Sequence, residues 1–137
     1  MIKPFTKALT LLFLSATLFT ACKKDKEETL TVSEETLPGV YTLGSIKIGG
    51  EDVTNQLGID ACEIDNQYTI RADNTYKYED VGKKCDPVDD YEGLWFLDNN
   101  VLEFDGWEGP IKKLTNKALV IEQVESGITY TITFNRK

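Results

Sequence analysis

The last strand-like segment of the chain, Ile128-Thr129-Tyr130-Thr131-Ile132-Thr133-Phe134-Asn135, decides the fold class. Its apolar residues stand at every second position, and threonines separate them. A period of two is typical of a β-strand that buries one face and exposes the other. We therefore expect the apolar side chains of this segment to face the core and its threonines to face solvent.

The same pattern continues upstream as far as Pro38, interrupted at short intervals by turn residues such as Gly49-Gly50, Asp73-Asn74 and Ser126-Gly127. No long helical period occurs, and residues 51–59 are expected to form a short helical turn or an irregular loop. The expected strands are residues 40–48, 67–72, 75–80, 91–97, 101–105, 111–115, 118–125 and 128–135.

About eight strands joined in sequence by short links can bury one face each and hide their edges by closing into a barrel. The sequence therefore predicts an all-β fold, a small antiparallel up-and-down β-barrel. A two-sheet β-sandwich would produce the same signals and is the alternative fold.

The N-terminus has the pattern of a lipoprotein signal peptide. Lys3 and Lys7 are followed by a short apolar run over residues 8–19 and by Thr20-Ala21-Cys22. The run is shorter than the roughly 20 apolar residues of a membrane span. We expect residues 1–21 to be removed and Cys22 to carry the lipid. Ordinary secretion with an incidental cysteine is the alternative.

Residues 22–37 are rich in Lys, Glu, Ser and Thr and poor in apolar side chains. Such a segment buries too little surface to offset the entropy of ordering, so we expect a flexible tether. Residues 38–137 then form one domain.

The composition excludes several classes of function. Removing residues 1–21 takes away two lysines and no acids, which leaves 13 basic and 23 acidic residues and a net charge of −10. This charge argues against nucleic acid as a partner. The chain has no histidine, which removes Ser-His-Asp and Cys-His catalysis and the commonest zinc ligand. We expect no catalysis, no cofactor and no metal.

Assigning Cys22 to lipid leaves Cys62 and Cys85 as an even pair. In an oxidising compartment, such a pair is expected to form a disulfide. A redox-active role is the competing interpretation, but redox-active pairs usually have the spacing Cys-x-x-Cys.

The predicted inner face is rich in aromatic side chains and provides candidate residues for binding a small apolar ligand. They are Tyr68, Ile70, Tyr76, Tyr78, Trp95, Tyr130, Ile132 and Phe134. The alternative is that these side chains simply fill the core, because eight strands enclose little more than their own side chains.

Two other features are candidate sites. The acidic segment 86–92 offers oxygen ligands for calcium but lacks the alternating acids and the glycine of an EF-hand loop; Glu103, Asp105 and Glu108 are no stronger as candidates. Trp107 lies in a predicted loop, where it either folds over the barrel mouth or serves as an exposed contact.

Several segments together resemble the lipocalin-like domain of Bacteroidota lipoproteins over nearly all of residues 38–137. The matching segments are 37–43, 61–66, 68–76, 82–85, 93–97 and 114–119. Tyr41 stands where such first strands usually carry tryptophan, so its hydroxyl would need a partner inside the barrel.

The resemblance implies a lipid-anchored barrel in the cell envelope, and the charged run after Cys22 is similar to the surface-export signals of this group. We expect the outer membrane, facing the periplasm or the cell surface. The expected function is binding of a small apolar ligand. The alternatives are an interaction or structural subunit of an envelope complex and, less favoured, an enzyme that uses paired carboxylates.

Overall fold

The computed structural model describes residues 26–137, so the predicted signal peptide and Cys22 lie outside the described residues. Within residues 26–137, no helix is both long and apolar enough to cross a membrane. The elements are β1 (Gly39–Ile48), β2 (Glu51–Asp52), η1 (Thr54–Gln56), β3 (Gln67–Ile70), β4 (Thr75–Glu79), β5 (Tyr91–Leu94), β6 (Phe96–Asp98), β7 (Val101–Phe104), β8 (Trp107–Leu114), β9 (Ala118–Glu125) and β10 (Ile128–Arg136).

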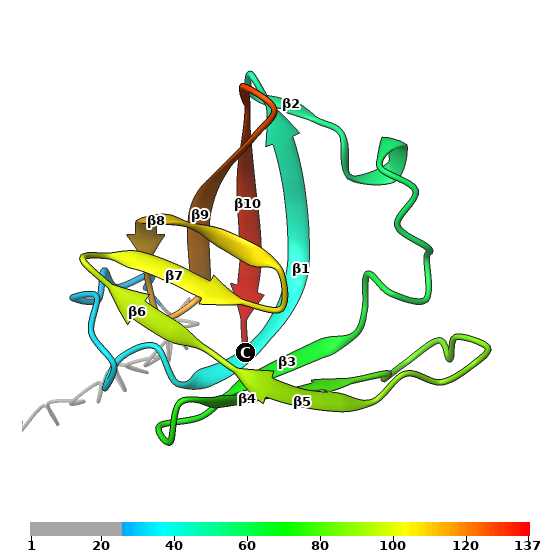
Figure 1. Cartoon of the computed structure of the whole chain (residues 1–137), viewed down its shortest axis with the longest axis horizontal. Helices are drawn as coiled ribbons and strands as arrows, with labels where there is room; N and C mark the ends of the chain where they lie inside the picture. Colours follow the sequence, from blue (N-terminus) through cyan, green and yellow to red (C-terminus); the bar gives the residue numbers. More distant parts are fainter. Residues whose placement is uncertain (1–25) are drawn as a thin grey trace, which may run out of the picture.

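The strands form one continuous antiparallel sheet in the order β5-β4-β3-β1-β10-β9-β8-β7-β6, with β2 paired to β1. The sheet curls around a single core into a nearly closed barrel (Figure 1). Apart from the pairs β1–β10 and β1–β3, each strand pairs with its neighbour in the chain. The predicted up-and-down barrel is confirmed, and the two-sheet alternative is not observed.

The barrel closes through a bent segment of chain. β5 and β6 are the two ends of the sheet, yet only Trp95 separates them in sequence. The Trp95 amide donates to the Asn74 carbonyl at 2.9 Å, and its indole Nε1 donates to the Arg71 carbonyl at 2.8 Å. Trp95 is fully buried. The single strand predicted over residues 91–97 is therefore two short strands that turn about this side chain.

β8 also differs from the prediction, because it begins at Trp107 rather than at residue 111. Gly109-Pro110 reads as a turn in the sequence, but both residues lie within the strand. A Cβ at Gly109 would overlap the backbone carbonyl of Glu122, so glycine is what lets β8 lie this close to β9. This extension places Trp107 inside the barrel wall.

One end of the barrel is filled by Tyr41. Its ring is fully buried, and its hydroxyl donates to the Leu37 carbonyl at 2.6 Å, which is the partner that this hydroxyl was expected to need. The Arg136 guanidinium lies 5.6 Å from the ring centroid and donates to the Pro38 carbonyl at 2.7 Å. We call this the closed end.

The barrel is expected to lose stability as the pH rises from about 10 toward 12. Burial raises the pKa of Tyr41 to about 12, and the nearby Arg136 offsets only part of this effect. A hydroxyl whose pKa is higher in the folded chain than in the unfolded chain stabilises the fold fully below the unfolded value, near 10. That contribution disappears as the pH passes the folded value. Urea unfolding at neutral pH and near pH 11 measures the loss.

Tyr41→Phe separates the two roles of this hydroxyl. At neutral pH this variant should have a free energy of unfolding about 1 to 2 kcal/mol lower than the wild type, because the Leu37 carbonyl loses its donor. Between neutral pH and pH 11, the free energy of unfolding should fall less in this variant than in the wild type. An identical alkaline decline in both proteins would contradict the assignment.

Residues 26–37, which were predicted to be a flexible tether, contact the barrel instead. Thr29 forms an isolated β-bridge with Thr115, and the Leu30 amide donates to the Leu114 carbonyl at 2.9 Å. Leu30 and Val32 pack against the core, and Leu37 is fully buried. The burial of these apolar side chains stabilises the segment against the barrel. The many charged residues around them made the segment look unstructured in the sequence. The segment therefore lies along the closed end of the barrel.

All strand pairs and the buried core cluster lie within residues 37–136. A chain that lacks residues 1–21 therefore keeps the contacts that hold the barrel. Binding experiments can therefore use the chain from residue 22 onward, with Cys22→Ser to remove the cysteine that is expected to carry lipid.

Candidate ligand-binding site

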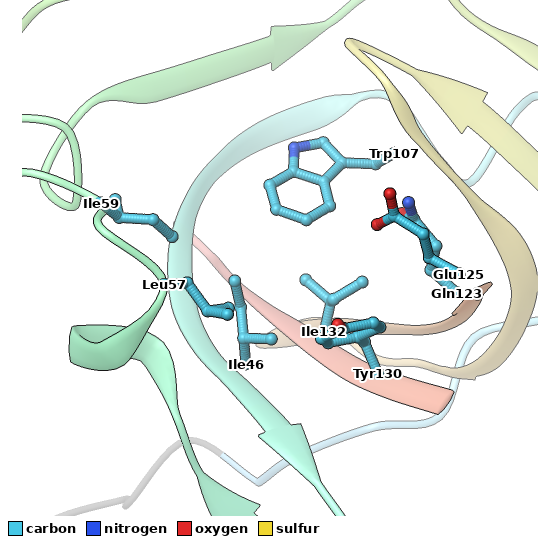
Figure 2. A pocket seen from close by; sticks show the side chains of 8 residues that line it. All are labelled: Ile46, Leu57, Ile59, Trp107, Gln123, Glu125, Tyr130 and Ile132. Atoms are coloured by element: carbon cyan, nitrogen blue, oxygen red, sulfur yellow. The ribbon is translucent and has the colours of Figure 1, made fainter. Parts of the chain in front are cut away.

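The end of the barrel opposite Tyr41 contains a hollow of about 260 Å³. We call it the mouth cavity (Figure 2). Figure 2 shows Trp107 across from the strand residues Ile46, Tyr130 and Ile132, with the loop residues Leu57 and Ile59 on one side and Gln123 and Glu125 on the other.

A second hollow of about 240 Å³, the inner cavity, shares Trp107 and Ile59 with the mouth cavity. Its remaining lining is Leu43, Glu63, Tyr68, Tyr78 and Tyr91. Trp107 and Ile59 therefore form the boundary between two adjoining hollows. The Trp107 ring packs edge-on against Phe134, with their centroids 5.8 Å apart. Trp107 thus folds inward at the barrel mouth instead of serving as an exposed contact.

The eight predicted lining residues fall into two groups. Four of them line a cavity: Tyr130 and Ile132 the mouth cavity, Tyr68 and Tyr78 the inner cavity. The other four belong to the packed core and line neither cavity: Ile70, Tyr76, Trp95 and Phe134. The barrel is therefore filled over part of its length and hollow near its mouth.

Sequence reasoning missed the contribution of β1. Tyr41 and Leu43 point inward in strict alternation, but the next inward residue is Ile46, because the register shifts between Leu43 and Ser45. This irregularity is a β-bulge at Gly44. A glycine inside a strand pattern is a recognised signal for a bulge, so the inward position of Ile46 was open to prediction.

Residues 37–121, more than half of the chain, match the family described as lipocalin-like domain. The chain belongs to the lipocalin-like domain family. No curated protein and no solved structure gives a significant match to it. The family assignment agrees with the up-and-down barrel and covers β1 to the middle of β9, including most of the residues that line the two cavities.

Asp105 is a second residue that sequence reasoning did not place in this lipocalin-like barrel. It lies in the tight turn between β7 and β8 with a φ of 50°. Its carboxylate accepts hydrogen bonds from the Tyr76 hydroxyl at 2.9 Å and from the Tyr91 hydroxyl at 2.8 Å. The β7–β8 hairpin is thereby joined to β4 and β5 from the other end of the sheet. Asp105 therefore joins the two ends of the sheet at the seam of the barrel.

The hydroxyls of Tyr68, Tyr76 and Tyr91 stay protonated far above neutral pH. Burial, followed by the hydrogen bond to Asp105, raises the pKa of Tyr76 to about 12. Burial likewise raises the pKa of Tyr68 and of Tyr91 well above the usual range. These hydroxyls therefore act as neutral hydrogen-bonding groups and not as bases at physiological pH.

The predicted disulfide between Cys62 and Cys85 is confirmed, with the two Cα atoms 5.3 Å apart. Cys62 lies in the loop between η1 and β3, and Cys85 lies in the loop between β4 and β5. The first of these loops also carries Leu57, Ile59 and Glu63, which form one wall of the cavities. The disulfide thus ties a cavity wall to the rest of the lipocalin-like barrel.

The acidic segment 86–92 borders a third hollow of about 440 Å³ beside the disulfide. Asp60, Glu63, Asp86 and Asp89 line it. Over residues 26–137, however, no three aspartate, glutamate or cysteine side chains gather closely enough to hold a metal ion.

Proposed function

We propose that this chain is a lipid-anchored envelope protein whose lipocalin-like barrel binds a small apolar ligand at its mouth, without catalysis. The observation that carries this proposal is the pair of adjoining hollows divided by Trp107 and Ile59. Apolar and aromatic walls with a few polar groups are typical of small-ligand sites. Because each hollow is small, the ligand is expected to be a single alkyl chain or a compact aromatic molecule.

The proposed anchor rests on the signal pattern that ends at Cys22 and on the resemblance to Bacteroidota lipoproteins. The segment from residue 26 joins the barrel beside Thr115, at the closed end. A lipid on Cys22 would therefore hold the mouth away from the membrane surface, which we propose to be the outer membrane. Labelling cells with a fatty acid tests the anchor: the label should attach to the wild type and be absent from Cys22→Ala.

Leu57→Asp is expected to weaken the binding of a neutral apolar dye, N-phenyl-1-naphthylamine, by roughly tenfold or more. Leu57 forms part of the apolar wall and is 43% exposed, so the variant should fold while placing a charge where the ligand lies. Fluorescence titration of the dye measures the change.

Val124→Asp is the matched control for this experiment. Val124 is 67% exposed and lies on the outer face of β9, so the aspartate of this variant adds the same charge outside the mouth cavity. Its dye affinity should equal that of the wild type. Equal binding by all three proteins, or no saturable binding by the wild type, would contradict the proposed site.

A second candidate function is that of an interaction subunit, and one observation favours it. Leu94 and Phe96 flank the buried Trp95 at the barrel seam and are 58% and 54% exposed. Exposed apolar side chains on sheet edges are suited to contacts with another protein. Crosslinking in cells from the seam would recover a partner if this function holds, whereas recovery of the monomer alone would count against it.

A further inference from the structure

The charges around the cavities indicate what kind of ligand they favour. The ionisable side chains of their linings, besides tyrosines, are the carboxylates of Glu125 in the mouth cavity and Glu63 in the inner cavity. Among the described residues, no lysine or arginine lines either hollow. Both glutamates are exposed to solvent, and an anionic head group beside either of them would meet repulsion with no cation in the lining to offset it.

Glu125, the last residue of β9, places the negative charge of the mouth cavity near its opening. Along β9, the side chains that face inward change from the buried Leu119 and Ile121 to Gln123 and then Glu125. The inner surface thus becomes polar and then acidic toward the opening. Figure 2 shows Gln123 and Glu125 projecting from the same side of the mouth cavity. An apolar tail would lie against Ile46 and Ile132, while its head group would meet Glu125.

We propose that the ligand is a cationic amphipath, an apolar tail that carries an ammonium group. This inference rests on the proposed ligand-binding function and names the ligand class of the same site. Glu125 supplies the opposite charge, and the aromatic rings of Trp107 and Tyr130, which line the same cavity, favour a cation over an anion. The net charge, −8 for the full sequence and −10 without residues 1–21, also attracts a cation at long range.

Three probes with the same tail and different head groups test the proposal. They are octylamine, which is protonated at neutral pH, 1-octanol and octanoate. Each is titrated calorimetrically into the wild type and into Glu125→Gln, which keeps the shape of the side chain and removes its charge. Glu103→Gln is the control, because Glu103 lies outside both cavities on the exposed face of β7. Circular dichroism verifies that each variant folds.

The wild type should bind octylamine about tenfold more tightly than 1-octanol and bind octanoate most weakly. Glu125→Gln should remove most of the preference for octylamine and leave 1-octanol unchanged, and Glu103→Gln should behave as the wild type. High salt should reduce the preference, because the charge at the mouth is exposed to solvent.

Two results overturn the proposal in different ways. If octanoate binds as tightly as octylamine, or if Glu125→Gln keeps the full preference, the charge selectivity is wrong while ligand binding stands. If none of the three probes binds, both the proposed binding function and the proposed ligand class are wrong.

Discussion

Replacing both Cys62 and Cys85 by serine is expected to lower the free energy of unfolding by roughly 3 kcal/mol, the value that the chain-entropy model gives for a loop of this size. It is also expected to weaken ligand binding, because the disulfide holds the loop that carries Leu57 and Ile59. The measurements are urea unfolding and titration with N-phenyl-1-naphthylamine.

The wild type treated with a reductant serves as the control for this variant. Its stability and dye affinity should fall to those of the double serine variant, since both lack the same covalent bond. If the double variant unfolded at the urea concentration of the wild type and bound the dye equally well, the loop would be held by its packing alone. That result would contradict the role given to the disulfide.

Asp105→Ala is expected to destabilise the barrel by about 2 to 3 kcal/mol. The hydroxyls of Tyr76 and Tyr91 would lose a charged acceptor inside the barrel. Alanine is also strained at the positive φ of this position. Urea unfolding measures the loss, and Asp98→Ala is the control, because within residues 26–137 the Asp98 side chain accepts a single, exposed hydrogen bond from the Asn99 amide.

Asp105→Asn separates the hydrogen bonds from the backbone strain. Asparagine tolerates positive φ and keeps one oxygen acceptor, so the loss should be smaller, about 1 kcal/mol. Stability equal to that of the wild type in both Asp105 variants would show that the carboxylate does not hold the seam.

The regular part of the fold was predictable from the sequence because it depends on local alternation. β10 shows this best: of its alternate apolar residues, Tyr130, Ile132 and Phe134 point inward as expected. Ile128, also expected in the core, is instead 43% exposed, because it is the first residue of the strand after the turn. The predicted strand boundaries were wrong where tertiary packing overrides the local pattern. Trp95 divides one apparent strand into two, and Gly109 allows β8 to continue through a predicted turn.

The candidate site was harder to predict than the fold. Tyr76 and Phe134 share the alternation of the cavity residues, but they are packed against other rings in the core. No local pattern distinguishes an inward side chain that meets a neighbour from one that meets a void. The loop residue Leu57 and the turn residue Asp105 reach their positions through the disulfide and the hairpin. These long-range arrangements are invisible in a single sequence.

The two tryptophan side chains offer the most direct test of a lipocalin-like barrel that binds at its mouth. Trp107 borders both cavities, whereas the fully buried Trp95 donates its indole hydrogen to the Arg71 carbonyl away from them. Each gives its own indole N–H signal in a nitrogen-15 correlation spectrum. During titration with 1-octanol, the Trp107 signal should shift and saturate while the Trp95 signal stays in place. A Trp107 signal that does not move, or a shift of the Trp95 signal alone, would contradict binding at the mouth.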